Sequence, residues 1–502
     1  MSPVEFIVFL FAVAALVWVA ALLRFSPSIE AKPIRIIPAL TMAIVISGSV
    51  LGAEFFSLEA GPIPITIDRL LFCGVVALCG WFYLTNREDL QPFNRLDLGM
   101  IAMMGILTFS TLTHDHTYRE NLPLSQLLFF NLIPFGVYFI ARTAKTFPDD
   151  LRMYRFGFVL FAIYLAITAV LELKGVYGLV FPKFIIDTTQ TEFLGRGRGP
   201  FLNPVSNGVF QVFGLCCLWF WWPKATTRMR VLIVVASLLL TIGVYATLTR
   251  SVWMSVVLVG FLIVFLPAPQ HFKGAMVVAG VVAMIFAGPT LLEKAGGFKR
   301  DKDVNVSQMK ESAQLRPLFL TVAMRMFQDR PIFGCGYGQY FREKTPYLQD
   351  PYTGKPLSKT KDYVQHNVFS AYLTELGLVG LLSLIVVLGM MVRVAWRIWS
   401  RTDSELIARQ FGMLMGALLA VYVANGMFHD VSISPMLNML LFFTAGVANN
   451  IQCNPQRFKA AAEMADSAEA IVERPTTTAP NSQFEPHTVP VSYTHLTLPT
   501  KA

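Results

Sequence analysis

The sequence predicts an all-α protein that crosses a membrane many times, and three observations support this prediction. Hydrophobic residues make up 54% of the 502 residues and charged residues only 15%, whereas about a quarter of the residues in a soluble domain are charged. The mean hydropathy is +0.54. The apolar residues come in blocks of about 18 or more, the length that a bilayer requires. Helices are the expected form, because a backbone exposed to lipid must satisfy its own hydrogen bonds.

The apolar blocks predict about 12–13 transmembrane helices. The first block is too long for the core of a signal peptide, and its basic residues follow it, so it is expected to be a true span with its N-terminus outside. The candidate spans lie at about 5–23, 36–56, 64–84, 97–113, 125–143, 155–174, 205–222, 230–248, 252–267, 273–291, 368–396, 410–428 and 434–450.

Lys and Arg residues are distributed unevenly between alternate short loops. One set of loops carries 17 of them and the opposite set carries 5. Cytoplasmic loops hold the excess in membrane proteins, so the richer set is predicted to be cytoplasmic. This bias also accounts for the net charge of +9 without nucleic acid. The six cysteines are spread over spans, tail and one loop, which favours neither a disulfide framework nor a metal site.

The predicted organisation has one large membrane domain interrupted by a long outer loop. That loop has 74 residues with 13 Lys and Arg against 8 Asp and Glu, and such long loops are usually functional or disordered. Within it, 316–329 has the apolar spacing of an interfacial amphipathic helix. The predicted parts are N-terminal helices (1–174), helices with arginine-bearing outer loops (175–291), the large outer loop (292–365), C-terminal helices (366–450) and a disordered cytoplasmic tail (451–502), whose end (491–502) resembles translated vector sequence.

Several arginines on the predicted outer face have the chemistry to bind phosphate. Arg196 and Arg198 lie in GRGRGPFLNP, where glycines allow close approach to a ligand, and a guanidinium can bind phosphate with two hydrogen bonds. They could equally anchor the loop at the interface. Arg250 lies in a very short turn between two spans. A charge there is costly unless it is paired or reaches the interface, so a structural and a functional role remain equally open.

Three further features lie in or after the large loop. GCGYG (334–338) follows no strand and opens no clear helix, so it is interpreted as a tight turn and not as a dinucleotide site. His366, beside Asn367 where the loop returns to the membrane, has the chemistry of a proton acceptor, although a lone histidine at a membrane boundary is more often a hydrogen-bonded structural residue. Glu375 lies inside an apolar helix, where carboxylates are usually paired or functional. The run 301–303 is interpreted as a solvated charge run, so no metal site is expected.

Taken in order, these motifs resemble the O-antigen ligase family. The family also includes polysaccharide polymerases and protein O-oligosaccharyltransferases, and the resemblance covers roughly residues 190–400. It rests on five elements: Arg-x-x-Gly-Pro-Phe-x-Asn-Pro (196–204), Leu-Thr-Arg-Ser (248–251), Arg316 with Asp-Arg-Pro-Ile-Phe-Gly-x-Gly (329–336), His-Asn (366–367) and Glu-Leu-Gly-Leu-Val-Gly (375–380).

The resemblance implies a GT-C-type glycosyltransferase in the bacterial inner membrane, with its active site facing the periplasm and with neither metal nor other cofactor. The donor would be a glycan on undecaprenyl diphosphate. The acceptor would be lipid A–core in a ligase, a second lipid-linked repeat in a polymerase, or Ser or Thr in a protein ligase. The implied catalytic residues are His366, Arg250 and Arg196, and the resemblance leaves open whether Arg196 or Arg198 is the key arginine of its motif. The implied diphosphate ligands are Arg198 and Arg316, with Asn367 and Glu375 holding these groups in place.

Two other classes of protein remain as alternatives. A transporter of lipid-linked oligosaccharides would also have many spans with interior charges. Transporters usually have repeated halves with broken helices near the bilayer midplane, and the sequence has no clear repeat. A receptor or scaffold would use the long loop for docking. It would leave unexplained why arginines and histidine recur at one depth, so the transferase is favoured.

Overall fold

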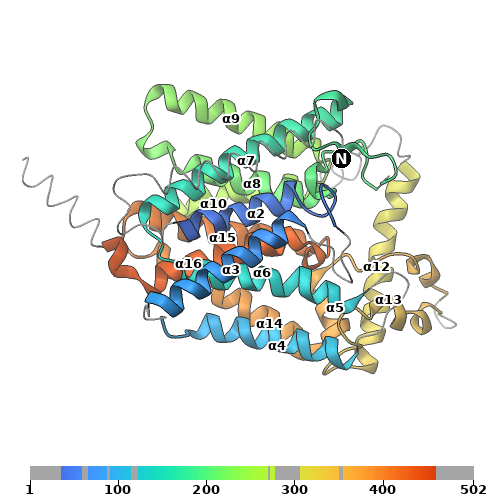
Figure 1. Cartoon of the computed structure of the whole chain (residues 1–502). Helices are drawn as coiled ribbons and strands as arrows, with labels where there is room; N and C mark the ends of the chain where they lie inside the picture. The colour runs from blue at the N-terminus through green and yellow to red at the C-terminus, as the bar shows by residue number, and fades with distance from the viewer. Residues whose placement is uncertain are drawn as a thin grey trace, which may run out of the picture.

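The computed structural model describes residues 36–58, 66–86, 91–114, 122–190, 192–269, 272–276, 306–349 and 354–459. The regular elements of this part of the chain are helices, which confirms the predicted all-α class. Figure 1 shows them packed as a bundle, with α12 and α13 together at one end. The bundle helices are α2 (Ile36–Val50), α3 (Ile67–Asn86), α4 (Arg95–Thr113), α5 (Pro123–Gln126), the π-helix η3 (Leu127–Leu132), α6 (Ile133–Thr143), α7 (Pro148–Lys174), α8 (Pro204–Trp219), α9 (Thr227–Ala246), α10 (Arg250–Phe265), α14 (Val368–Trp399), α15 (Leu406–Gly426) and α16 (Pro435–Cys453).

Seven helical segments in the described residues are long and apolar enough to cross a membrane, so the chain is a multi-pass membrane protein. The helices α2 and α10 are also apolar but shorter, with 15 and 16 residues. The predicted span 5–23 lies outside the described residues, as does most of 273–291. The number of 12–13 helices therefore stays a prediction. The seven segments are Arg95–Thr113, Pro123–Thr143, Pro148–Lys174, Pro204–Lys224, Thr227–Ala246, Val368–Trp399 and Leu406–Gly426.

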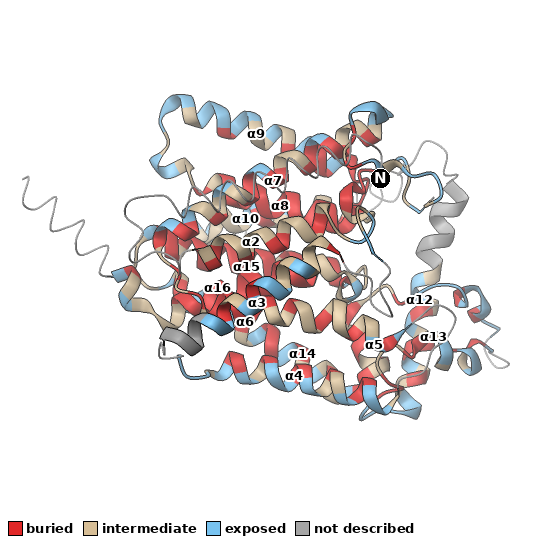
Figure 2. Cartoon of the chain, in the orientation of Figure 1, coloured by how far each residue is buried: buried red, intermediate tan, exposed pale blue. Residues whose placement is uncertain are grey.

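The burial of the helices fits a bundle surrounded by lipid. The side chains of α8 are buried along almost its whole length, because α7, α9, α10 and α15 pack around it. The helix α9 lies on the outside, and Val231, Leu232, Val235 and Leu238 on it are exposed (Figure 2). A large exposed apolar surface of this kind marks contact with a membrane or a partner.

At each end of the bundle, a hydrogen bond joins a residue that precedes one helix to a residue inside another helix. At one end, Asn94 before α4 donates to Asn449 in α16 at 2.6 Å. At the other end, Ser206 at the start of α8 lies 2.8 Å from Ser434 before α16. The loop between α6 and α7 lies at the first end, and the described part of the large loop lies at the second end, before α14.

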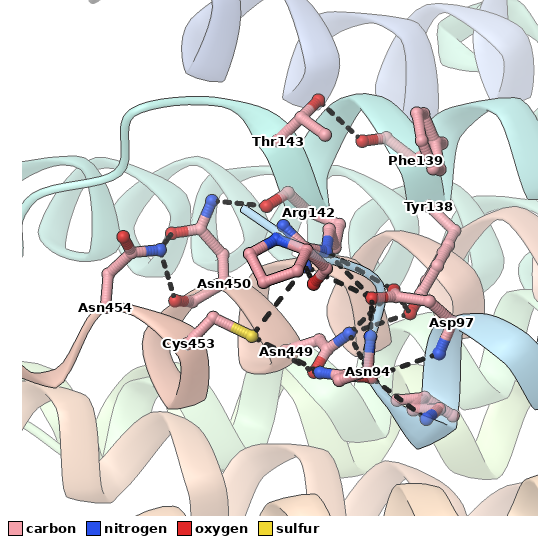
Figure 3. Close-up of polar contacts among 12 residues, drawn as sticks. Asn94, Asp97, Tyr138, Phe139, Arg142, Thr143, Asn449, Asn450, Cys453 and Asn454 are labelled. Carbon is pink, nitrogen blue, oxygen red and sulfur yellow. Dashed lines mark hydrogen bonds and ion pairs between the residues drawn. The ribbon is translucent and has the colours of Figure 1, made fainter. Parts of the chain in front are cut away.

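A network of buried polar side chains joins three helices at the end opposite the large loop (Figure 3). Asp97 in α4 and Arg142 in α6 form an ion pair at 3.1 Å, with both side chains 1% exposed. Tyr138 and Asn449 donate to Asp97 Oδ1 at 2.6 and 2.9 Å. Arg142 Nη2 also donates to the carbonyl of Pro92 at 2.9 Å. Both charges therefore have the additional partners that a buried ion pair needs.

The described part of the large loop is folded around its own small apolar core. The helix α12 (Val306–Asp329) includes the predicted helix 316–329 but begins earlier, at Val306. It is followed by α13 (Tyr340–Glu343), η8 (Thr345–Leu348) and η9 (Leu357–Thr360). The core consists of Val322, Met326, Cys335, Tyr340, Leu348 and Leu357. Buried Lys344 closes this unit, because its Nζ donates to the carbonyls of Thr360 and Tyr363 at 3.1 and 2.8 Å.

Candidate active site

Arg196 holds the turn that leads into α10. Its guanidinium donates to the carbonyls of Thr247 and Leu248 at 3.0 to 3.2 Å and to Thr249 Oγ1 at 2.8 Å. The side chain is 5% exposed. Arg196 therefore fixes the backbone that immediately precedes Arg250, so two predicted site arginines are linked through one turn.

Arg198 is fully buried and is surrounded by backbone carbonyls. Its guanidinium donates to the carbonyls of Ile185, Gln190 and Glu192 at 2.6 to 3.0 Å and to that of Asp187 at 3.2 Å. This geometry closes the loop before α8 and leaves the side chain little capacity for an outside ligand. It differs from the geometry expected of a residue that binds diphosphate.

Arg250, Arg316 and His366 come from three distant segments and lie close enough to interact electrostatically. Arg250 is the first residue of α10, Arg316 lies in α12, and His366 lies just before α14. Burial lowers the pKa of Arg316, and the positive charge of Arg250 lowers it further. Burial also lowers the pKa of His366, with the charge of Arg316 as the second cause. The fold therefore brings three predicted site residues together.

Aromatic side chains pack against this cluster. The guanidinium of Arg316 lies 5.4 Å from the centre of the Phe428 ring, a distance at which a cation is attracted to the ring. The Phe319 ring contacts the His366 ring edge-on, with centroids 5.0 Å apart. The contact with Phe428 partly removes the Arg316 guanidinium from water, which strengthens its attraction for an anion.

Asn367 orients the chain at the histidine. Its side-chain oxygen accepts hydrogen bonds from the backbone N–H groups of Phe369 and Ser370 at 2.8 and 3.1 Å, so it caps α14. Its Nδ2 donates to the carbonyl of Met427 at 3.1 Å. Asparagine is a preferred residue for this cap. The cap fixes the start of α14 beside His366 and beside the segment that carries Phe428.

The sequence led us to expect that Glu375 holds an arginine or the histidine. In the structure, Glu375 instead binds the backbone of the glycine-rich turn. Its carboxylate accepts hydrogen bonds from the N–H groups of Gly338 and Tyr340 at 3.0 and 3.3 Å. The N–H of Gly336 donates to the Glu375 carbonyl at 2.9 Å. Residues 331–335 and 337–338 form turns, which confirms the interpretation of GCGYG. The GCGYG turn (334–338) therefore docks onto the Glu-Leu-Gly-Leu-Val-Gly motif (375–380).

This docking depends on a break in α14 at Gly377. The residue has φ +63° and ψ −158° inside the helix, a region that is essentially restricted to glycine. The N–H groups of Leu378 and Val379 leave the helix and donate to the carbonyls of Pro331 and Ile332 at 2.8 and 3.2 Å. The break therefore gives the turn its hydrogen-bond partners.

We expect Gly377→Ala to destabilise this junction strongly. An added Cβ would lie 2.3 Å from the Ile332 carbonyl oxygen, and the backbone conformation alone costs about 1–3 kcal/mol for other residues. The apparent unfolding temperature of the purified protein should fall. Gly389→Ala in the same helix is the matched control, because no atom lies within 4 Å of its added Cβ. Equal unfolding temperatures for the two variants would contradict this account of the junction.

The central part of the chain matches a known family. Residues 235–385 match the family profile described as O-antigen ligase. This part of the chain is an O-antigen ligase domain. The match contains Arg250, Arg316, His366 and Glu375, and it confirms the family predicted from the order of the motifs. The family implies an enzyme of the ligase or glycosyltransferase type. No curated protein matches the chain.

The O-antigen ligase domain contacts residues on both sides of its own boundaries in the sequence. Arg196 lies before it, and Phe428 and Asp430 lie after it. Asp430 lies in the short segment between α15 and α16, where its Oδ1 accepts a hydrogen bond from the N–H of Ser432 at 3.2 Å. Sequence reasoning did not single out Asp430. The sequence feature that could have identified Asp430 is the position of its carboxylate between two apolar helices.

Proposed function

We propose that the protein transfers a glycan from undecaprenyl diphosphate to an acceptor hydroxyl at the periplasmic face of the bacterial inner membrane, with lipid A–core as the acceptor. The observation that carries this proposal is the meeting of Arg250, Arg316 and His366 inside the O-antigen ligase domain. Two cations beside a histidine suit a reaction in which an anionic group leaves and a hydroxyl attacks.

The arginines would stabilise the diphosphate as it leaves. Negative charge grows on the bridging oxygen when the bond from the anomeric carbon to the diphosphate breaks. Fixed cations lower the energy of that state most in a site that excludes water, and arginine remains charged at neutral pH. Arg250 and Arg316 would supply this charge, so the reaction needs no metal ion.

His366 would accept the proton of the attacking hydroxyl. Burial and the nearby Arg316 lower its pKa, so the imidazole is neutral at pH 7, the form that a base requires. Direct attack on the anomeric carbon would invert its configuration. The proton passes to the imidazole, and the electron pair of the broken bond passes to the diphosphate.

The other predicted residues would position these three. Arg196 would hold the turn before Arg250, Asn367 would cap α14 beside His366, and Glu375 would hold the glycine-rich turn. Arg198 would close the loop before α8, because its donors are directed at backbone carbonyls. This assignment gives Arg198 a structural role in place of the diphosphate contact suggested by the resemblance.

The acceptor is tested with purified protein, glycan on undecaprenyl diphosphate, and EDTA. We expect glycan to appear on added lipid A–core, followed by gel mobility and mass. Longer lipid-linked chains without an added acceptor would instead identify a polymerase, and glycan on a Ser- or Thr-containing protein would identify a protein O-oligosaccharyltransferase. Movement of intact lipid-linked glycan across the bilayer, with no new glycosidic bond, would support the transporter.

We expect Arg316→Gln to move the acidic limb of the pH profile of kcat/KM to higher pH. The positive charge of Arg316 lowers the pKa of His366, so its removal lets that pKa rise and the histidine becomes protonated at higher pH. The pH at the midpoint of the acidic limb is measured. The rate itself is not used, because it should also fall when Arg316 is replaced. Arg325→Gln in the same helix is the control, since Arg325 bonds to the carbonyl of Gln349. A midpoint that is unchanged or moves to lower pH would contradict the prediction.

A further inference from the structure

A cavity lies beside the cation cluster, at the same end of the bundle. Its volume is ≈ 200 Å³, and it is enclosed by the glycine-rich turn, the start of α14, η3 and the segment that follows α15. The side chains that matter most for its chemistry are Tyr337, Tyr340, Phe341, Gln365, Glu375 and Asp430. No residue role proposed above accounts for this space.

Tyr340, one of the residues that line the cavity, has a buried hydroxyl group without a hydrogen-bond partner in the part of the chain that the structure describes. Tyr340 is 4% exposed, and its Oη has no hydrogen-bond partner among the described residues. Its backbone N–H donates to Glu375, so the backbone of Tyr340 is held at the cavity wall. A buried polar group without a partner costs about 1–3 kcal/mol, which a ligand with its own hydroxyl groups would recover.

Two carboxylates line the same cavity. Asp430 Oδ1 accepts from the N–H and Oγ of Ser432 at 3.2 and 2.5 Å, and Oδ2 has no hydrogen bond within the described part of the chain. Burial raises the pKa of Asp430 to about 6, so this carboxylate is largely ionised at pH 7.5. Glu375 is held by two backbone N–H groups. An ionised carboxylate only accepts hydrogen bonds, so the cavity favours ligands that donate them and disfavours phosphate.

The cavity and the cation cluster share two segments of chain. Gln365, which lines the cavity, directly precedes His366. Asp430 lies two residues after Phe428, whose ring contacts Arg316. The site therefore combines a cationic cluster, which contains Arg250 and Arg316, with a neighbouring cavity that two carboxylates line. A ligand with a diphosphate at one end and hydroxyl groups next to it matches this division of charge.

We propose that this cavity binds the sugar ring attached directly to the diphosphate of the donor. The inference rests on the proposed function, and it adds where the first sugar ring of the donor binds. Glu375 and Asp430 would accept hydrogen bonds from ring hydroxyl groups, Tyr340 would use its free Oη, and the Tyr337 and Phe341 rings would cover the apolar faces.

A sugar suits the cavity better than a divalent cation. Ca²⁺ takes six to eight oxygen ligands, and Mg²⁺ demands a near-octahedral set. The cavity supplies two carboxylates, and both already accept hydrogen bonds from backbone N–H groups. Within the described ranges no three His, Cys, Asp or Glu side chains come together as a metal site would need.

The test compares the affinity for two lipids in nanodiscs at pH 7.5 with EDTA. One is undecaprenyl diphosphate carrying its glycan, and the other is undecaprenyl diphosphate alone. The ratio of their Kd values measures what the sugar contributes. Tyr340→Phe and Asp430→Asn should each reduce that ratio by roughly 3- to 10-fold, as expected for one lost hydrogen bond. The Kd of the lipid without glycan should change by less than about 2-fold.

Tyr363→Phe is the matched control, because Tyr363 is exposed and lies in the same returning segment, outside the cavity wall. It should leave both Kd values unchanged. A ratio that stays at the wild-type value in folded Tyr340→Phe and Asp430→Asn proteins would overturn the sugar site and leave the proposed function intact. Failure of the wild-type protein to bind either lipid would overturn both.

Discussion

Replacing His366 or Arg250 by alanine is expected to lower the transfer rate by about 100-fold or more. Loss of one preorganised electrostatic group costs about 100- to 1,000-fold in comparable sites, and loss of a general base costs about 100- to 10,000-fold. Both residues lie in the O-antigen ligase domain, and each interacts electrostatically with the same Arg316. The initial rate with saturating donor and acceptor measures the effect.

A loss of activity must be separated from a loss of folding. Arg342→Ala is the matched control, because Arg342 is 44% exposed and contacts Glu343 within the same loop unit. It should keep the wild-type rate. All variants are compared at equal amounts of inserted protein and equal unfolding temperature. A folded His366→Ala or Arg250→Ala protein with the wild-type rate would remove that residue from the catalytic site.

The second large effect is expected at the other end of the bundle. Arg142→Met should reduce the free energy of unfolding by about 3–5 kcal/mol, because it leaves the Asp97 carboxylate buried and unpaired. Asp97 and Arg142 are each 1% exposed, so water cannot replace the lost partner. The apparent unfolding temperature in detergent measures this loss.

Two further variants separate the buried charge from general damage. Arg152→Met is the control, because Arg152 is 54% exposed in its ion pair with Asp149 and such pairs contribute about 0–1 kcal/mol. Asp97→Asn combined with Arg142→Met should recover part of the loss, since the unpaired charge is removed. Equal stability of the Arg142→Met and Arg152→Met proteins would contradict the importance of the network in Figure 3.

The membrane bundle could be predicted from sequence because its signal is local. A span is a run of apolar residues, and the helix that it forms satisfies its own backbone. Breaks inside the spans were not predicted. The unwinding at Gly377 depends on hydrogen bonds to Pro331 and Ile332, which lie more than forty positions earlier in the chain, and no local pattern reports that pairing.

The same limit applies to the site. Arg196 and Arg198 are alike in sequence and are separated by one glycine, yet one holds the turn before Arg250 and the other closes the loop before α8. Glu375 was expected to hold a cation, and its partners are backbone N–H groups of a distant turn. Asp430 has no recognisable motif. Its place in the cavity wall appears only when η10 (Val431–Ile433) and the segment around it meet the start of α14.

The most direct test of the central claim counts the leaving group. Purified protein is mixed with undecaprenyl-diphosphate-linked glycan and acceptor in EDTA, and both the product and the free undecaprenyl diphosphate are quantified by mass. We predict one free undecaprenyl diphosphate for each glycan transferred, and neither product from the His366→Ala and Arg250→Ala proteins. Glycan that crosses the bilayer still attached to its diphosphate, with no free undecaprenyl diphosphate, would contradict the transferase and support transport.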